Sequence, residues 1–140
     1  LTTDISVGFP GETETTFKES CDFAREIGFT HIHTFKYSKR NGTKAAVMPD
    51  QVPEPVKTER SETMRQISLE NKTKYFETMQ GRTERMLVER IDSRGIARGY
   101  GEHYLPIQFS GDTTRNTFIN IRLGEILHRG NEDKMAFNAI

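Results

Sequence analysis

The sequence predicts an α+β fold in two parts, a partial α/β segment followed by a small β-barrel. Three patterns carry this prediction. Residues 4–9, 13–28 and 29–37 read as strand, amphipathic helix and strand with short joints. Residues 56–76 read as one long helix with a thin apolar stripe. After residue 76 the chain breaks into about five short β segments separated by Gly- and Asp-rich turns.

The first segment predicts a βαβ unit. Its helix places Phe17, Cys21, Ala24 and Ile27 on one apolar stripe, and Gly28 follows as a helix stop. Short joints on both sides imply a parallel strand pair with a right-handed crossover. One such unit cannot bury both faces of its strands, so we expect it to be part of a larger α/β fold. The chain starts at a strand without an initiator methionine, and we expect further polypeptide on its N-terminal side.

Two segments connect this unit to the barrel. Residues 38–55 are irregular, with an Asn-Gly turn signal and three prolines near their end. The helix at 56–76 is expected to lie across a surface or to bridge two units, because its apolar stripe is thin. The residues near that one face are Val56, Arg60, Met64, Ile67, Asn71 and Tyr75.

The barrel prediction depends on a hairpin and on regular spacing. A strand at 85–91, the turn DSRG and a return strand at 96–100 form the hairpin. The remaining strands are expected at 105–109, 117–127 and 134–140, separated by SGDTTRN and HRGNED. Five strands in about 60 residues favour a closed, five-stranded, OB-like antiparallel barrel. The predicted domains are 1–54, a bridging helix at 55–76, and 77–140.

Composition narrows the class of protein. The 140 residues carry 20 basic and 20 acidic side chains, so no global basic excess indicates nucleic acid. The charges also balance on both sides of Phe76, but eight of the nine cations after it are arginine. A single cysteine excludes an intramolecular disulfide and fits a reducing compartment. No apolar run approaches the length of about 18–20 residues needed for a membrane span. We therefore expect a cytoplasmic protein with no membrane contact.

The turn GFPGET between the first strand and helix permits three interpretations. It is a plain strand-to-helix turn, an anion site in which free amides at the helix start face a phosphate, or the wall of a cofactor pocket. The motif lacks the Lys-Ser/Thr of a P-loop and the glycine spacing of a dinucleotide fingerprint. A small nucleotide- or anion-binding α/β protein therefore remains a rival with little support.

Several linked motifs resemble one enzyme family. They are D-I-x-V-G-F-P-G-E-T, then H-x-F-x-Y-S-x-R-x-G-T-x-A-A, then D-Q-V before a K-x-x-R helix, then ISLENKTKYFETMQGRTERMLVE. In this order they resemble the C-terminal part of the MiaB-like tRNA methylthiotransferases. In that family the end of a radical S-adenosylmethionine (SAM) barrel leads into a TRAM domain. GYGEHYLPIQF is similar to the branch that acts on threonylcarbamoyl-adenosine rather than isopentenyl-adenosine.

The resemblance implies a transferase that converts an N6-modified adenosine next to the anticodon into its 2-methylthio derivative. It also implies SAM and two [4Fe–4S] clusters as cofactors of the whole enzyme, each cluster held by several cysteines. Cys21 is the only cysteine and lies on an apolar stripe, where it reads as a small buried hydrophobe. We expect this chain alone to bind neither cluster, to hold no catalytic residue and to be inactive.

The resemblance also places candidate cofactor-binding residues at the ends of the two strands. Glu12 is explained equally by contact with a ligand or by the helix macrodipole. His31 and His33 form an H-x-H pair, which is a spacing of some metal sites, but no third ligand accompanies them, so no metal site is expected. The residues expected beside SAM are Val7, Gly8, Phe9, Pro10, Phe35 and Tyr37.

The TRAM part is expected to bind the tRNA anticodon stem-loop. Arginine suits this role because its planar fork binds phosphate and stacks on bases. The rival interpretation is a solvated, ion-paired surface, since Glu84, Glu89 and Glu102 alternate with these arginines. The candidate RNA-binding residues are Arg85, Arg90, Arg94, Arg98 and Arg122, with Tyr100 and Tyr104 as stacking surfaces.

Three further expectations concern partners. The chain is expected to work with the missing N-terminal part of the same polypeptide. A dimer formed through an exposed edge of the α/β barrel is a second hypothesis. The alternative function is a stand-alone RNA-binding OB-like adaptor without catalysis.

Overall fold

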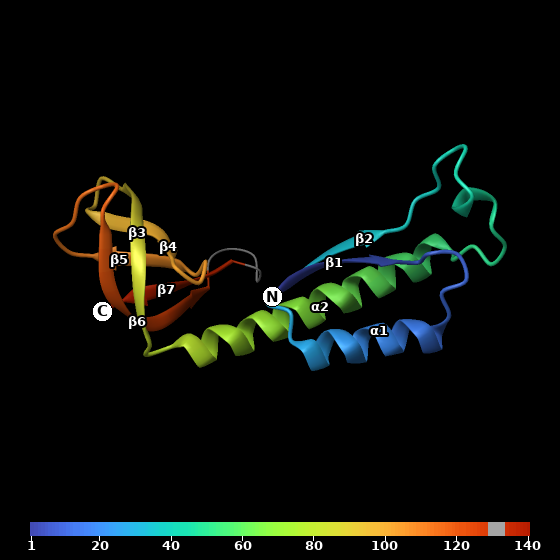
Figure 1. Ribbon diagram of the computed structural model, residues 1–140, viewed down its shortest axis with the longest axis horizontal. Helices are drawn as coiled ribbons and strands as arrows, with labels where there is room; N and C mark the ends of the chain where they lie inside the picture. Colours follow the sequence, from blue (N-terminus) through green and yellow to red (C-terminus); the bar gives the residue numbers. More distant parts are fainter. Residues whose placement is uncertain (129–133) are drawn as a thin grey trace. The chain divides into compact units, whose positions relative to one another are not determined.

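The computed structural model describes residues 1–128 and 134–140 and divides into two compact units, Leu1–Lys74 and Tyr75–Ile140 (Figure 1). Of the turn predicted at HRGNED, residues 129–133 lie outside the described residues. Helix α2 (Glu54–Met79) is continuous across the division at residue 74. None of the helices in the described part of the chain is long and apolar enough to cross a membrane.

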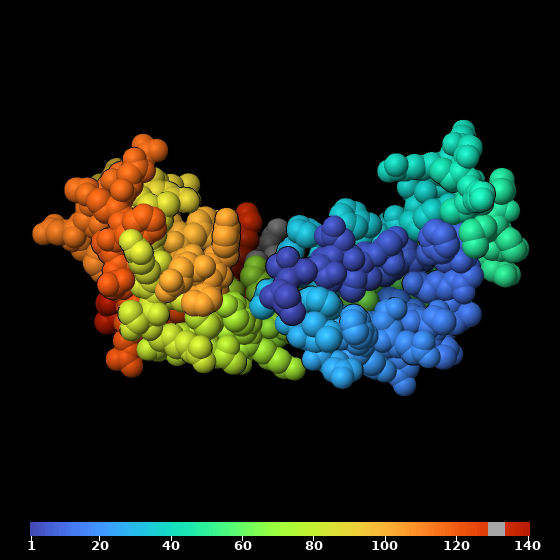
Figure 2. All heavy atoms as spheres, in the orientation of Figure 1, coloured from blue at the N-terminus to red at the C-terminus, as the bar shows by residue number. Residues whose placement is uncertain are grey.

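The first unit contains the predicted βαβ arrangement. Strands β1 (Thr2–Val7) and β2 (His31–Lys36) pair in parallel, and helix α1 (Glu14–Ile27) connects them. The helices lie on one side of the strand pair (Figure 1). Between β2 and α2 the chain is irregular except for one short 3₁₀ turn (η1, Ala45–Val47). This segment projects from the unit at the carboxyl end of the strands (Figure 2).

Helix α1 begins and ends where its sequence predicts. Thr13 is the N-cap, and its hydroxyl and the Thr16 side chain each accept from the other residue's backbone N–H. Gly28 ends the helix in the left-handed region, with φ of 70°, and its N–H donates to the Ala24 carbonyl. A left-handed C-terminal residue is easily adopted only by glycine, so this position fixes the end of the helix.

The core of the first unit lies between the strand pair and the two helices. Because strand residues alternate, Asp4, His33 and Phe35 are exposed on the opposite face of the sheet. Only one face of β1 is therefore covered in this chain. Ile27 is also 42% exposed, because it lies at the end of α1 past the last core residue of that helix. The buried core residues are Val7, Phe17, Cys21, Ala24, Ile32, Met64 and Ile67.

Helix α2 covers this core with a mixed apolar and polar stripe. Met64 and Ile67 are fully buried, as their spacing predicts. The Asn71 amide donates to the Ala24 carbonyl at 3.0 Å, and the Ser68 hydroxyl accepts from the Ile32 N–H at 2.9 Å. The polar members of the stripe therefore hydrogen-bond to backbone groups of α1 and β2 inside the core.

The second unit is a closed five-stranded barrel with the order β3-β4-β5-β7-β6. Four of its strand pairings are antiparallel, but β5 and β7 are parallel. The barrel is therefore mixed rather than wholly antiparallel, because β7 inserts between β5 and β6 and runs in the direction of β5. The strands are β3 (Thr83–Ile91), β4 (Ile96–Gly101), β5 (Pro106–Ser110), β6 (Phe118–His128) and β7 (Met135–Ala139).

The barrel interior is closed by an aromatic pair. Phe76, in the last turns of α2, stacks on Phe137 of β7 with ring centroids 5.0 Å apart and planes 6° from parallel. Both rings are almost fully buried. Met86, Val88 and Leu123 are inaccessible to solvent, as expected for the inward residues of alternating strands.

Gly8, which follows β1, provides a test of this packing. Its φ is +76°, and a Cβ there would lie 2.3 Å from Cγ of Lys57 on α2. Gly42 has a φ of +84° but nothing within 4 Å of its Cβ position. Gly42→Ala should therefore lower the free energy of unfolding only by the cost of a left-handed backbone conformation, about 1 kcal/mol. Gly8→Ala should cost at least about 2 kcal/mol, because Lys57 must also shift.

Urea unfolding followed by the helical circular dichroism signal would measure both free energies. Equal losses for the two variants would show that the contact with Lys57 is not a constraint.

Candidate functional site

The carboxyl ends of β1 and β2 bring most of the predicted cofactor residues together. Because the strands are parallel, Val7 and Tyr37 lie at the same edge, where the Tyr37 N–H donates to the Val7 carbonyl at 2.8 Å. The rings of Phe9 and Tyr37 meet edge to face, with centroids 5.3 Å apart. Phe35 is separate, because it lies on the open face of the sheet and is 56% exposed.

Glu12 is engaged within the protein. Its Oε1 accepts from the Gly8 N–H and from Nη1 of Arg60, both at 2.8 Å. Arg60 also donates to the Glu12 carbonyl at 3.1 Å, and its guanidinium lies 5.4 Å from the Phe17 ring centroid. The two side chains of this ion pair are only 15% and 8% exposed. The pair ties the turn after β1 to α2, which neither interpretation of Glu12 anticipated.

Lys57 makes a second tie between α2 and the strand ends. Its Nζ donates to the Tyr37 carbonyl and to Oε1 of Glu54, each at 3.1 Å, and lies 5.3 Å from the Tyr37 ring centroid. The hydrogen bond from Lys57 lowers the pKa of Glu54 below its usual value. The Lys57 methylenes fill the space that Gly8 leaves, so close approach of a ligand is not the reason for glycine at that position.

Two aromatic side chains, Phe9 and Tyr37, lie at this edge. The Phe9 ring is 46% exposed. The Tyr37 hydroxyl is buried and has no hydrogen-bond partner among the described residues. The Gly8 N–H is already occupied by Glu12. At this edge the Phe9 ring is therefore open to a ligand, whereas the backbone N–H of Gly8 is not.

The cysteine and two of the histidines of the first unit are residue types that could hold a metal or cluster. Cys21 is buried, and burial raises the pKa of its thiol, which disfavours the thiolate that metals bind. His31 and His33 stack edge to face with ring centroids 4.3 Å apart. Their Nε2 and Nδ1 atoms lie 3.4 Å apart, so the two rings contact each other.

The outer face of the barrel carries most of the predicted RNA-binding residues. Strand alternation turns Arg85 and Leu87 of β3 outward, together with Arg98 and Tyr100 of β4. Phe118 of β6, 59% exposed, also faces outward, and sequence reasoning missed it. The alternation of Phe118, Asn120 and Arg122 with buried or half-buried isoleucines was the signal that could have identified it.

Arg85 and the tyrosines border one shallow hollow of about 300 Å³ on this face. The Arg85 guanidinium lies 4.4 Å from the Phe118 ring centroid. Tyr100 and Tyr104 have ring centroids 6.2 Å apart. Tyr104 is 86% exposed and has a φ of 60°, an uncommon conformation for a bulky residue. The turn at Tyr104 is thus held in a shape that displays an aromatic ring.

A bulge brings two arginines together in a second hollow of about 280 Å³. The register between β3 and β4 shifts between Val88 and Arg90, which places Arg90 opposite Arg98. Gly99 permits the bulge, because a Cβ there would lie 1.8 Å from the Leu87 carbonyl oxygen. Arg98 donates to Oδ2 of Asp92 at 2.7 Å.

The remaining candidates lie elsewhere. Arg94 is in the β3–β4 turn, and Arg122 donates from Nε to the Gly81 carbonyl at 3.0 Å. Neither of them lines the two hollows. Glu89 lines both hollows and Glu102 lines one, so acidic side chains do interleave with the arginines.

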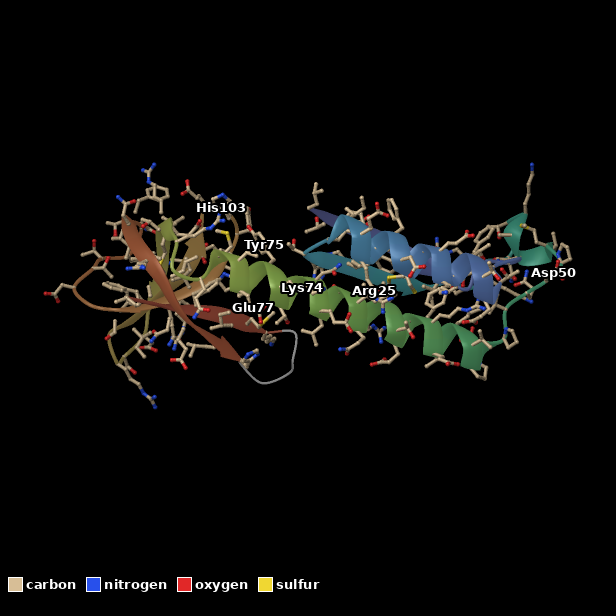
Figure 3. The ribbon with its side chains drawn as sticks, turned by 90° about the horizontal axis from the view of Figure 1, so that it is seen from below. Arg25, Asp50, Lys74, Tyr75, Glu77 and His103 are labelled. Atoms are coloured by element: carbon tan, nitrogen blue, oxygen red, sulfur yellow. The ribbon has the colours of Figure 1, made fainter. Side chains whose placement is uncertain are left out.

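A buried carboxylate supports the loop between β4 and β5. Glu84 is 1% exposed and accepts from the His103 backbone N–H at 3.3 Å and from its Nδ1 at 2.5 Å (His103 is labelled in Figure 3). Gly101 leaves room for this carboxylate, since a Cβ there would lie 2.3 Å from Oε2 of Glu84. Glu102 lies nearby, and the three side chains form a possible cation-ligand set. The hydrogen bonds between Glu84 and His103 fix the loop.

The two units define a class of protein before any comparison. A parallel βαβ unit with aromatic side chains at its strand ends is typical of ligand-binding α/β folds. A small OB-like barrel with outward arginines and aromatic rings is typical of nucleic-acid binding.

The comparisons with known proteins agree with the motifs. Over 129 residues the chain is 35% identical to a tRNA-2-methylthio-N(6)-dimethylallyladenosine synthase of Acinetobacter baumannii, which is 90% of this chain and 27% of that protein. A synthase of the same name from Pelotomaculum thermopropionicum is 45% identical over 116 residues, 80% of this chain and 25% of its own length. The threonylcarbamoyladenosine tRNA methylthiotransferase MtaB of Thermotoga maritima is 32% identical over 130 residues, 93% of this chain and 30% of its own. No protein-family model matches the chain.

The chain is therefore homologous to a segment of the tRNA methylthiotransferases, which confirms the family resemblance. It spans between a quarter and a third of the length of these relatives. The five-stranded barrel fits the predicted TRAM part. Relatives of both kinds occur, so the comparisons do not separate the two branches.

The Glu12–Arg60 pair can be tested with a matched arginine. Arg60→Met leaves the Glu12 carboxylate buried without its partner and should cost about 3 kcal/mol of unfolding free energy. Arg65→Met, on the same helix but 59% exposed and paired with the exposed Glu62, should cost less than about 1 kcal/mol. Urea unfolding followed by circular dichroism measures both, and similar losses would contradict a structural role for the buried pair.

Asp92 makes the stability of the β3–β4 hairpin depend on pH. Its pKa is lowered by the hydrogen bond from the Ile96 N–H, then by Arg98. A lowered pKa means that the stabilisation is complete above the unfolded value of about 3.9 and is lost as pH falls through the folded pKa. Asp92→Ala should therefore lower the Tm at pH 7, and the difference from wild type should shrink below about pH 4.

Amide NMR signals of β3 and β4 followed on heating would report this difference. Asp112→Ala, an exposed carboxylate in the β5–β6 loop, is the matched control and should change little. A loss for Asp92→Ala that stays constant at low pH would contradict the electrostatic explanation.

Proposed function

We propose that this chain is the C-terminal part of a radical SAM tRNA methylthiotransferase. Such an enzyme adds a methylthio group to C2 of an N6-modified adenosine next to the anticodon. The observation that carries the proposal is the alignment with methylthiotransferases over 80 to 93% of the chain. The open face of the β1–β2 sheet supports it, because a parallel sheet is normally covered on both faces.

In this proposal the first unit contributes one wall of the cofactor site. Cysteines outside this chain would hold the two [4Fe–4S] clusters, which with bound SAM would supply the radical chemistry and the sulfur. Phe9, Phe35 and the Tyr37 hydroxyl contact the adenosine part of SAM, with Val7 and Pro10 supporting them from buried positions. The Glu12–Arg60 and Lys57–Tyr37 contacts hold these groups in place. This chain alone is inactive in this proposal, since its single cysteine cannot supply the several thiolates that a cluster needs.

The second unit binds the tRNA anticodon stem-loop. Arg85, Arg90 and Arg98 are the arginines gathered in its two hollows. Arg94 and Arg122 extend the positive surface beyond the hollows and contact phosphates further along the stem. Arginine suits contact with phosphates and stacking on bases, because the phosphate contacts give affinity and the stacking positions the loop.

The choice of modified adenosine and the partners complete the proposal. The segment GYGEHYLPIQF favours threonylcarbamoyl-adenosine as the substrate base. The first unit assembles with the N-terminal part of the same polypeptide in the cytoplasm. Each strand of the two-stranded sheet has one edge without a partner strand among the described residues, where that part or a second copy can add a strand. A stand-alone RNA-binding adaptor is not favoured, because the alignment extends through the α/β unit.

A binding experiment tests the role of the second unit. The full chain should bind a fluorescent anticodon stem-loop more tightly than a scrambled hairpin, by fluorescence anisotropy. Affinity should fall with salt, with a log–log slope of about −0.7 per phosphate contacted on single strands. Equal affinity for both RNAs would contradict specific recognition. No binding at low or at moderate salt concentration would contradict RNA binding by this part of the enzyme.

A further inference from the structure

Four side chains from four adjacent strands form one apolar row on the outer face of the barrel. Leu87 of β3 lies opposite both Phe118 of β6 and Tyr100 of β4, and Tyr100 lies opposite Pro106 of β5. Phe118 is 59% and Tyr100 45% exposed, while Leu87 and Pro106 are half-buried. We call Phe118, Leu87, Tyr100 and Pro106 the aromatic row.

The aromatic row is too specific to be an accident of surface composition. Residues on one face of neighbouring strands meet only when the register is correct, and this register is fixed by the closed barrel. Apolar side chains aligned across four exposed strands are a surface that monomeric proteins rarely leave without a function. Tyr104, 86% exposed and 6.2 Å from the Tyr100 ring, extends the surface at one end.

Positive charge follows the aromatic row. Arg85 lies over the Phe118 ring, with its guanidinium 4.4 Å from the centroid. Arg90 faces Arg98 across the β3–β4 pair, and because Arg98 is already paired with Asp92 at 2.7 Å, Arg90 is the cation of this pair that remains for a phosphate. Among the described residues no carboxylate lies within ion-pair distance of Arg85 or Arg90. The Arg90–Arg98 pair is about 7 Å from the row, since Arg98 is two residues from Tyr100 along β4.

We propose that the aromatic row binds unpaired RNA bases by stacking, with the adjoining phosphates held by Arg85 and by the Arg90–Arg98 pair. The inference rests on the proposed function and deepens it, because it assigns the recognised part of the RNA to its unpaired loop. The base faces of an A-form duplex are hidden in the stack, so a stem offers nothing for this row to contact.

The dimensions and the fold agree with this partner. Four strands at a spacing of about 4.8 Å give a row about 14 Å long. That is room for about two or three bases, as on other sheets that bind RNA through aromatic side chains. OB-type barrels bind oligonucleotides on their second and third strands, which correspond here to β4 and β5. The aromatic row begins on those strands and extends the surface over β3 and β6.

The test compares three RNAs on the full chain: an eight-nucleotide single strand without self-complementarity, the same strand in a blunt duplex, and the anticodon stem-loop. The single strand should bind at least about tenfold more tightly than the duplex at equal salt. Phe118→Ala and Tyr100→Ala should each weaken binding of the single strand and of the stem-loop about tenfold. Arg85→Lys keeps the charge but loses the planar group, so it should weaken binding while leaving the salt slope unchanged.

Matched controls separate stacking from general effects. Phe23→Ala removes an aromatic ring of similar exposure, 55%, from α1 in the first unit and should leave affinity unchanged. Arg65→Lys, on the exposed face of α2, is the control for Arg85→Lys. Unchanged amide NMR spectra of β3 and β6 would show that the row variants remain folded.

The outcomes distinguish this inference from the proposed function. Stem-loop binding that is unchanged by Phe118→Ala and Tyr100→Ala would contradict stacking on the aromatic row. It would not contradict tRNA binding by this unit. Equal affinity for duplex and single strand would contradict stacking in the same way, whereas failure to bind any RNA would overturn both proposals. A dimer in sedimentation velocity that Phe118→Ala abolishes, with no effect on RNA affinity, would assign the row to a second copy instead.

Discussion

The parallel pairing of β5 with β7 is the interaction on which the second unit depends. It inserts a short last strand between β5 and β6 and so closes the sheet, which leaves no strand edge open. Once the barrel is closed, each strand residue faces either the interior or solvent, and a slip of one residue would exchange the two sets. Stacking of Phe137 on Phe76 holds β7 in register from the inside. The outward display of arginines and aromatic rings is thus a consequence of how the interior packs.

The first unit is held together differently, because its sheet has only two strands and one covered face. Its core is small, and α2 supplies it with few apolar side chains. Two buried cations of that helix, Lys57 and Arg60, bind the backbone and carboxylate groups at the strand ends instead. Buried ion pairs contribute little net stability, but they impose geometry, since a displaced partner would leave a charge buried alone. The strand ends that face the proposed cofactor are therefore held by electrostatic contacts from one helix.

Local arrangement explains how a chain of zero net charge can present the surface proposed to bind RNA. Several carboxylates are engaged within the fold, as Glu12 is with Arg60, Glu84 with His103, and Asp92 with Arg98. Arg85 and Arg90 have no such ion pair among the residues described. Glu89 and Glu102 remain beside them, which moderates the potential and favours stacking over charge alone as the basis of selectivity. A net charge of zero therefore does not argue against RNA binding by one face of the barrel.

The sequence by itself determined the local elements and the family. Helix α1 with its Thr13 and Gly28 caps, the β3–β4 hairpin and the order of strands followed from periodicity, capping and turn residues, which act within a few residues of one another. Tertiary structure decided what depends on contacts between distant segments. These are the parallel β5–β7 closure, the Glu12–Arg60 and Glu84–His103 pairs, and the position of Phe118 beside Arg85. No local pattern fixes such contacts, because strand register and the partners of buried charges are set only when the whole barrel or core has packed.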